Sequence, residues 1–213
     1  GLLSKTTFLT LCEEAVETIA THCHGISAIV GTPYLTAEGP ISAAAYIDAH
    51  GNIEYIGKRY VTARREMGYI VGSSIGSQTI RVENRNLKVV VGDDLSRVHD
   101  IDEDIDAIIS INARRYGKGI MSRRLEKMSR LAFTEGTNLI LMNQVGGSGD
   151  IVYDGTSGVL DSEGRLVLLL ESFKEDMRIF DTKAENKPFD VPLTTYNDRT
   201  RMVYEAACLG TRD

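Results

Sequence analysis

The first segment of the chain repeats apolar residues three or four positions apart. These residues are Phe8, Leu11, Cys12, Ala15, Val16, Ile19 and Ala20. Glutamates at positions 13, 14 and 17 stand between them. This spacing puts the apolar side chains on one face of a helix, so the segment is predicted to be an amphipathic helix that packs on a sheet.

The pattern changes to short β-rich runs between residues 27 and 94. The runs are Ser27–Val30, Ser42–Ile47, Ile53–Ile56, Gln78–Val82 and Leu87–Val91. Turn-forming residues separate them, as in His50–Asn52 and Glu83–Asn86. Several hairpins are therefore expected here.

After Asp94 strands and helices alternate. The predicted elements are a strand at Ala107–Ile111, a helix at Ile120–Thr134, a strand at Asn138–Met142, strands at Gly158–Leu160 and Arg165–Leu170 joined by a turn at Asp161–Gly164, and a helical pattern at Asp198–Leu209. The stretch beyond Asp181 has the character of a linker. This order predicts an α/β fold. Periodicity alone leaves two architectures open, a layered sandwich and a Rossmann-like sheet.

Composition and charge narrow the class of protein. The chain has 213 residues, 42% of them hydrophobic and 25% charged, with a net charge of -6. This length fits one globular domain, and the negative charge argues against nucleic acid as a partner. No apolar run approaches the roughly 20 residues that span a bilayer, and no signal peptide is evident. The protein is expected to be cytoplasmic.

The three cysteines lack the spacing of a disulfide framework or a zinc site. Cys12, Cys23 and Cys208 are far apart and odd in number, so reduced thiols are expected. His22 and His24 flank Cys23, but three adjacent residues give poor tetrahedral geometry. No metal site is therefore predicted.

Two motifs carry a resemblance to a known family. Asn143–Gly147 reads NQVGG, and Tyr153–Ser157 reads YDGTS. Together with Asn112, with Gly117-Lys118 and with the C-terminal stretch Tyr204–Asp213, they closely resemble the amidase domain of bacterial glutamine-dependent NAD synthetases, a branch of the nitrilase superfamily. The resemblance covers nearly the whole chain.

The resemblance implies a four-layer αββα sandwich that hydrolyses the side-chain amide of glutamine with a Glu-Lys-Cys triad. It divides the chain into an amidase domain at residues 1–182 and a linker with a helix at 183–213, leading to a synthetase domain of the same polypeptide. That absent domain would use ATP and magnesium to amidate nicotinic acid adenine dinucleotide. No cofactor is expected in this chain, and a homo-oligomer is expected.

The catalytic lysine of the family is carried over to Lys58. Gly57-Lys58 ends a predicted strand and is followed by Arg59-Tyr60 and Arg65-Glu66, which is similar to the family's lysine loop. In such a site the ammonium stabilises the oxyanion of the tetrahedral intermediate. Without the resemblance, a solvated lysine at a strand end would be the ordinary interpretation. Glu66 resembles a supporting acidic residue of the same loop.

The nucleophile of the family is not found. Its motif reads Cys-Glu-Asp-Leu just after a strand, and this chain has Gly92-Asp93-Asp94-Leu95 there. Glycine has no side chain and cannot attack an amide. The family's catalytic glutamate lies in a Pro-Glu-Leu motif that is also not found, and Gly1 resembles a point just downstream of it. The first strand and helix of the family are therefore expected to be missing. Natural loss and a sequence cut from a longer one both stay open.

Other pocket residues follow from the same motifs. Asp94, Asn112, Tyr116 and Asn143 are candidates, besides Glu66, for lining the substrate pocket. Asp93 is a catalytic candidate, because adjacent carboxylates can raise one another's pKa. The alternative is that Asp93 and Asp94 cap the following segment, as aspartate commonly does at helix starts.

Three functions stay open on these residues. The first is a glutamine amidase domain that lacks its nucleophile and acts as a scaffold or binding domain. The second is an active carbon–nitrogen hydrolase of another small amide through a rearranged site. The third is a binding module with a basic patch of Arg114, Arg115, Lys118, Arg123 and Arg124, although Arg123, Arg124 and Lys127 also fit the solvated face of a helix. Gly146, Gly147 and Gly149 do not form a phosphate-binding motif.

Overall fold

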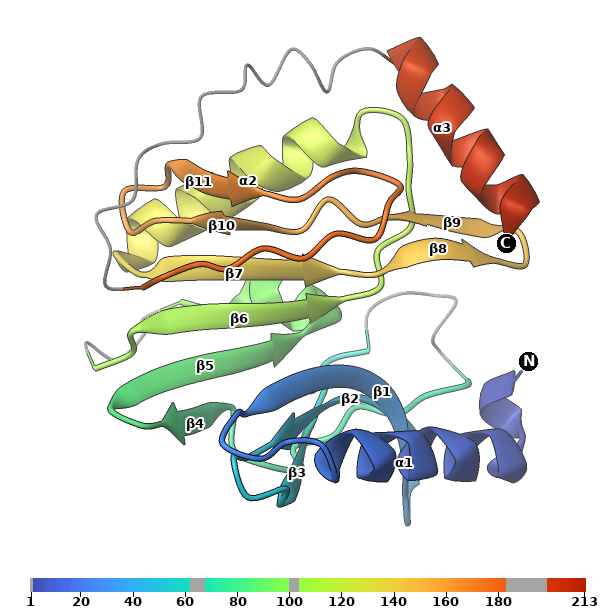
Figure 1. Cartoon of the computed structure of the whole chain (residues 1–213), viewed down its shortest axis with the longest axis vertical. Coiled ribbons are helices and arrows are strands. Elements are labelled where there is room, and N and C mark those ends of the chain that lie inside the picture. Colours follow the sequence, from blue (N-terminus) through green and yellow to red (C-terminus); the bar gives the residue numbers. More distant parts are fainter. Residues whose placement is uncertain (1, 62–67, 100–103, 183–198) are drawn as a thin grey trace. The chain divides into compact units, whose positions relative to one another are not determined.

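The computed structural model describes residues 2–61, 68–99, 104–182 and 199–213. The chain divides into two compact units, residues 1–105 and residues 106–213. Both contain helices and strands, and the strands pair in antiparallel and parallel fashion. The predicted α/β class is confirmed, with mixed sheets (Figure 1).

The first unit contains one long helix and two groups of strands. Its elements are η1 (Leu2–Ser4), α1 (Thr6–Ala20), β1 (Ala28–Thr36), β2 (Gly39–Ile47), β3 (Ile53–Gly57), β4 (Thr79–Val82), β5 (Arg85–Val91) and the 3-10 helix η2 (Gly92–Arg97). Strands β1, β2 and β3 form an antiparallel sheet in that order. Strands β4 and β5 form a hairpin whose turn is only Glu83-Asn84, because Val82 already pairs with Arg85. The predicted turn at Glu83–Asn86 is therefore two residues too long.

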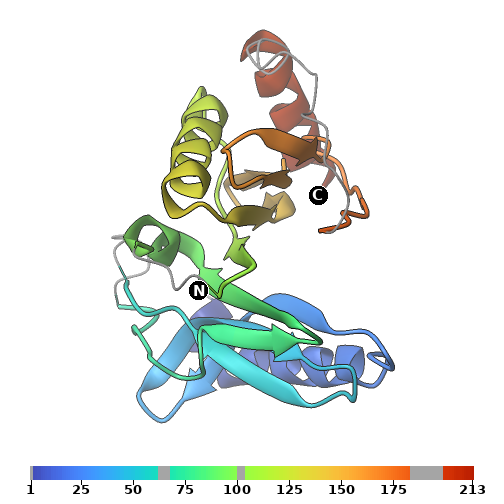
Figure 2. The ribbon, with the colours of Figure 1, turned by 90° about the vertical axis from the view of Figure 1, so that its left-hand side faces the viewer.

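Helix α1 packs on the sheet through a narrow stripe. Val16 and Ala20 join Ala45 and Ile47 of β2 in one buried cluster, and Figure 2 shows α1 running along this sheet. The predicted amphipathic helix is confirmed, but its apolar face is narrower than predicted, since Leu11 is 57% exposed. A single sheet covers only one side of a helix, so residues at the margin of the apolar face stay accessible.

The second unit is built on a parallel strand pair. Its elements are β6 (Ala107–Asn112), α2 (Ile120–Glu135), β7 (Asn138–Asn143), β8 (Val145–Ser148), β9 (Ile151–Asp154), β10 (Gly158–Leu160), β11 (Leu166–Leu169) and α3 (Arg199–Arg212). Strands β6 and β7 are parallel and α2 connects them, which confirms the predicted α/β order. β10 pairs with β7, and β11 pairs with β10, both antiparallel. Because β6 and β7 run in parallel and in register, they end side by side at Asn112 and Asn143.

Helix α2 buries Met121, Leu125, Met128 and Ala132, which recur at helical spacing. Glycines in the left-handed conformation stand at both of its ends. The prediction for Arg124 is wrong. The sequence analysis assigned this residue either to the solvated face of a helix or to a basic patch. Only 6% of Arg124 is exposed, because its side chain turns inward and pairs with Asp154.

The β8–β9 hairpin was not predicted. β8 contains Gly146 and Gly147, so it lacks the alternation of apolar and polar residues by which a strand is recognised. Helix α3 packs against both strands of this hairpin, with Ala206 and Leu209 buried beside Phe173. The linker predicted before α3 lies mostly outside the described residues, and the domain boundary at residue 182 stays a prediction.

Candidate active site

Lys58 follows β3 and is fixed by its backbone. Its N–H donates to the carbonyl of Ser42 at 2.8 Å, and its carbonyl accepts the N–H of Ser73 at 2.9 Å. Only 2% of the residue is exposed. Lysine is seldom buried so completely, because removing an ammonium from water is costly unless the surroundings compensate for it. The ordinary interpretation of a solvated lysine at a strand end is therefore wrong.

Gly92 lies beside the lysine. The buried end of β5, Val89 to Val91, leads into Gly92, whose φ is +60°. A Cβ built in ideal geometry on Gly92 would lie 3.5 Å from both Cε and Nζ of Lys58, and these would be among its nearest contacts. A side chain at position 92 would thus begin in van der Waals contact with the end of the Lys58 side chain.

Asp94 links η2 to the backbone that follows Lys58. Its carboxylate accepts the N–H of Arg59 at 2.6 Å and the N–H of Tyr60 at 3.1 Å. Asp94 is 3% exposed, and burial raises the pKa of its carboxyl group, while the two backbone hydrogen bonds and the charge of Lys58 act in the opposite direction. The expectation that Asp94 caps the segment after it is wrong, because its carboxylate binds a loop more than thirty residues earlier in the chain.

A second contact joins the same two segments. The guanidinium of Arg97 lies over the ring of Tyr60, 4.4 Å from its centre, a distance typical of a cation–π contact. Asp93 is half-buried, and its carbonyl accepts the hydroxyl of Ser96 at 2.7 Å. The catalytic role of Asp93 stays a prediction, and Glu66 lies outside the described residues.

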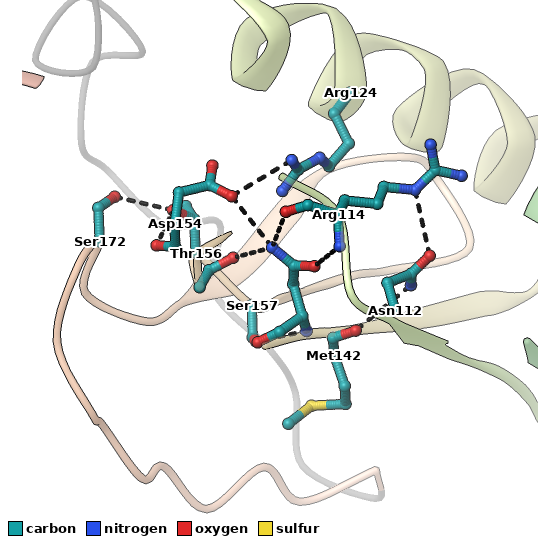
Figure 3. A network of polar contacts seen from close by, with 10 residues as sticks. Asn112, Arg114, Arg124, Met142, Asp154, Thr156, Ser157 and Ser172 are labelled. Carbon is teal, nitrogen blue, oxygen red and sulfur yellow. Dashed lines mark hydrogen bonds and ion pairs between the residues drawn. The ribbon is translucent and has the colours of Figure 1, made fainter. Parts of the chain in front are cut away.

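Asn112 and Asn143, the last residues of β6 and β7, belong to a polar network in the second unit (Figure 3). The amide nitrogen of Asn112 donates to Ser110 and to the carbonyl of Met142, and its oxygen accepts Nε of Arg114 at 3.2 Å. These contacts use both ends of the amide, and Asn112 is buried. They show Asn112 joining two strand ends, while its role in a substrate pocket stays a prediction.

Asn143 connects the end of β7 to two other segments, the one at Arg114 and the one that follows β9. Its Oδ1 accepts the N–H of Arg114 at 2.8 Å, and its Nδ2 donates to Asp154 Oδ1 at 3.0 Å and to the carbonyl of Gly155 at 2.9 Å. Its backbone N–H donates to the hydroxyl of Ser157 at 2.9 Å. The first asparagine of the NQVGG motif is thereby tied to the YDGTS motif. In this chain the two motifs therefore form one hydrogen-bonded unit.

Asp154 contributes a carboxylate to this network and is 1% exposed. Its Oδ1 lies 3.4 Å from Nη2 of Arg124, and both side chains are almost completely buried. Burial raises the pKa of the Asp154 carboxyl group, and the charge of Arg124 partly opposes this. Figure 3 shows Arg124 reaching from α2 toward Asp154. The sequence analysis gave Asp154 only as part of the YDGTS motif and assigned it no role. It placed Arg124, the partner of Asp154, on the surface.

Tyr116 packs in an apolar cluster. Its ring meets that of Phe173 edge to face, with 5.2 Å between the centroids, and its N–H donates to the carbonyl of Val152 at 2.7 Å. Burial, followed by the charge of Asp154, raises the pKa of its phenol. The structure therefore places Lys58, Gly92 and Asp94 together in the first unit, and Asn112, Tyr116 and Asn143 within the second.

Two further observations concern the described residues only. They contain no group of three or more histidine, cysteine or acidic side chains arranged to hold a metal ion. None of their helices has the length and apolar character needed to cross a membrane.

Comparison with known proteins gives relatives of one kind. No protein-family model matches the chain. The glutamine-dependent NAD(+) synthetase of Xylella fastidiosa (strain 9a5c) is 25% identical over 225 residues, which cover 100% of this chain and 41% of that protein. The enzyme of the same name from Acinetobacter baylyi is 26% identical over 110 residues, covering 51% of this chain and 20% of the relative. The chain thus spans less than half the length of these curated relatives.

Solved structures of two kinds of protein have a fold similar to that of this chain. The glutamine-dependent NAD+ synthetase of Acinetobacter baumannii, in complex with ADP, superposes with a TM-score of 0.78 at 22% identity, covering 100% of this chain and 42% of that one. A carbon-nitrogen hydrolase from Helicobacter pylori gives a TM-score of 0.69 at 17% identity, with 80% and 69% coverage.

The fold is therefore similar to that of a carbon-nitrogen hydrolase and to part of a glutamine-dependent NAD+ synthetase. In sequence, the full length of the chain matches part of the glutamine-dependent NAD(+) synthetases at about 25% identity.

Proposed function

We propose that this chain is the glutamine amidase domain of an NAD synthetase, in a form that lacks the catalytic nucleophile. In the intact system the domain would release ammonia from glutamine and pass it to a synthetase domain of the same polypeptide. That domain would amidate nicotinic acid adenine dinucleotide to NAD, with ATP and magnesium. The proposed architecture is the four-layer αββα sandwich of the nitrilase superfamily. The names of the relatives support the function, and their structures support the fold.

One observation carries the assignment of the site. The buried ammonium of Lys58 lies 3.5 Å from the place where the first side-chain atom of residue 92 would stand. In amide hydrolysis through an acyl-enzyme, a thiolate attacks the carbonyl carbon while a cation beside it stabilises the developing oxyanion. We assign the cation that stabilises the oxyanion to Lys58, and the attacking thiolate of the family to position 92.

Glycine at position 92 removes the attacking group. The remaining parts of the site can bind and polarise an amide but cannot form a covalent intermediate, so this form is proposed to be catalytically defective. The basic-patch alternative loses Arg124, which is buried against Asp154. A hydrolase acting through a rearranged site is kept as an outcome of the following test.

The test measures ammonia release from glutamine. Three proteins are compared: the chain itself, its Gly92→Cys variant, and a longer form that carries both Gly92→Cys and the upstream segment with the family's glutamate. We expect release only where cysteine stands at position 92, and most of it in the longer form, because the glutamate shuttles the proton.

Two controls separate the possible causes. Adding Lys58→Met to the longer Gly92→Cys form should reduce kcat by at least about 100-fold, the usual loss when an oxyanion donor is removed. Ammonia release by the unaltered chain would show that the nucleophile has been placed wrongly and would favour the rearranged hydrolase.

A further inference from the structure

Three successive backbone N–H groups after β3 have fixed acceptors. The N–H of Lys58 donates to Ser42 of β2, within the same sheet. The next two, from Arg59 and Tyr60, donate to the two oxygens of a single side chain, Asp94, at 2.6 and 3.1 Å. Asp94 thus binds the backbone at the point where the lysine leaves the strand.

The same carboxylate is fixed at its own end. Asp94 lies two residues after Gly92 in η2, and both Asp94 and the next residue, Leu95, are buried. The contact of Arg97 with the ring of Tyr60 joins the two segments a second time. One short helical turn therefore carries both position 92 and the group that binds the backbone beside Lys58.

We propose that Asp94 is a positioning residue, which keeps the ammonium of Lys58 beside position 92 by binding the backbone N–H groups of Arg59 and Tyr60. This inference rests on the proposed function, since Lys58 has a reaction to serve only there. Asp94 was predicted from the sequence to line the pocket. Its two hydrogen bonds assign it instead to the support of the lysine loop.

A positioning role and a purely electrostatic role predict opposite effects on a thiol introduced at position 92. A nearby ammonium lowers the pKa of a thiol, and a nearby carboxylate raises it. If Asp94 acts only through its charge, Asp94→Asn lowers the thiol pKa. If Asp94 positions Lys58, the same substitution lets the ammonium move away, and the thiol pKa rises.

The first experiment measures that pKa. The Gly92→Cys variant is alkylated with iodoacetamide over a range of pH, and the rate is followed by mass spectrometry on the peptide that contains residue 92. We expect a pKa below that of an ordinary cysteine. Adding Lys58→Met should raise it, and adding Asp94→Asn should raise it as well, with a several-fold slower reaction at pH 7.

Asp48→Asn is the matched control. Asp48 also accepts two backbone N–H groups, from His50 and Asn52, at 2.8 and 2.9 Å, in a turn of the same unit. Added to Gly92→Cys, this substitution should leave the thiol pKa unchanged. A lowered or unchanged thiol pKa in the Asp94→Asn form would overturn the positioning role.

The second experiment needs neither the introduced thiol nor the proposed function. Amide hydrogen exchange is measured in the unaltered chain, in Asp94→Asn and in Asp48→Asn. We expect exchange at Arg59 and Tyr60 to be several-fold faster in Asp94→Asn alone. Equal exchange in the unaltered chain and Asp94→Asn would overturn the proposed attachment of the loop.

The two readouts separate the two ways of failing. If Lys58→Met leaves the thiol pKa unchanged, the placement of Lys58 in the proposed site is overturned. Asp94 would then not support a catalytic lysine. The exchange rates then still decide whether Asp94 holds the loop. If Lys58→Met raises the thiol pKa and Asp94→Asn does not, the proposed site stands and the positioning role of Asp94 falls.

Discussion

At the scale of single residues, the structure brings together two positions that sequence reasoning had selected through the family resemblance, since a Cβ on Gly92 would lie 3.5 Å from Nζ of Lys58. The catalytic roles of these positions stay predictions. Asp94 and Arg124 were misassigned because their partners lie 34 or 35 and 30 residues away. Helical or strand periodicity carries no information about such distant partners.

Asp94 makes a pH-dependent contribution to stability. Burial raises its pKa above the ordinary value of 3.8. The folded state therefore binds the proton of this group more tightly than the unfolded state does. Its contribution is fully present below the ordinary pKa and is lost as pH rises through the raised folded value.

The measurement compares the free energy of unfolding of the unaltered chain with that of Asp94→Asn, by urea denaturation from pH 3 to pH 8. Relative to the variant, the unaltered chain should lose stability as pH rises through this window, by about 1.4 kcal/mol for each unit by which the pKa is raised. A difference that grows with pH would mean that the two backbone hydrogen bonds outweigh burial.

At the scale of elements, the strands and helices with clear apolar patterns were predicted to within a few residues. β1 is the largest difference, because it continues to Thr36 through Gly31 and Pro33, which β propensity disfavours. Pairing with β2 along its whole length overrides that preference. The β8–β9 hairpin was missed because Gly146 and Gly147 remove the alternation of apolar and polar residues from β8, which is one of its two strands.

The pair of Arg124 and Asp154 joins α2 to the end of β9. Arg124→Met leaves a buried carboxylate without its cation, which should cost about 3–5 kcal/mol. Asp154→Asn should cost a similar amount for the converse reason. The double variant should be far less destabilised than the sum of the two, because it leaves no charge buried alone. Nε and Nη1 of Arg124 have no hydrogen-bond partner among the residues that the structure describes, so replacing both residues also removes two donors left unsatisfied there.

A double-mutant cycle by urea denaturation measures this coupling. Arg123→Met is the matched control, because Arg123 is the exposed neighbour of Arg124 on α2 and its Nε donates to the carbonyl of Gly119 in its own helix turn. That variant should change stability by less than about 0.5 kcal/mol. Additive effects of the two buried substitutions would contradict the interpretation of the pair.

Close packing of α3 on the β8–β9 hairpin depends on Gly210. A Cβ at this position would lie 2.8 Å from Cγ2 of Val152, closer than van der Waals contact allows. Gly210→Ala should therefore loosen the docked helix and speed amide exchange in Arg199–Arg212, although alanine favours a helix by about 1 kcal/mol.

Val152→Ala removes the opposing methyl groups. Exchange in the Gly210→Ala/Val152→Ala form should be slower than the separate effects of the two substitutions predict, because the added and removed methyl groups compensate each other. If Gly210→Ala instead slows exchange, helix propensity outweighs packing at this contact.

At the scale of the whole molecule, motif resemblance supplied a prediction where periodicity left the architecture open. Alternating strands and helices fit two architectures, and the NQVGG and YDGTS motifs pointed to one superfamily. In the structure these motifs form the internal hydrogen bonds around Asn143. The residues with candidate chemistry, Lys58 and Gly92, lie in the other unit. The hydrogen bonds that hold the fold together at Asn143 and the candidate chemistry at position 92 thus rest on different residues, so one can change while the other is kept.

The backbone angle at Gly92 has a consequence for how such a chain evolves. At φ +60° an L-amino acid carries roughly 1–2 kcal/mol of conformational strain that glycine does not. A lineage that no longer depends on the reaction gains stability by accepting glycine at this position, and it loses stability by returning to any other residue. If position 92 carries the nucleophile as proposed, the exchange that removes it is favoured by folding, so selection on stability alone would make the loss easy to acquire and hard to reverse.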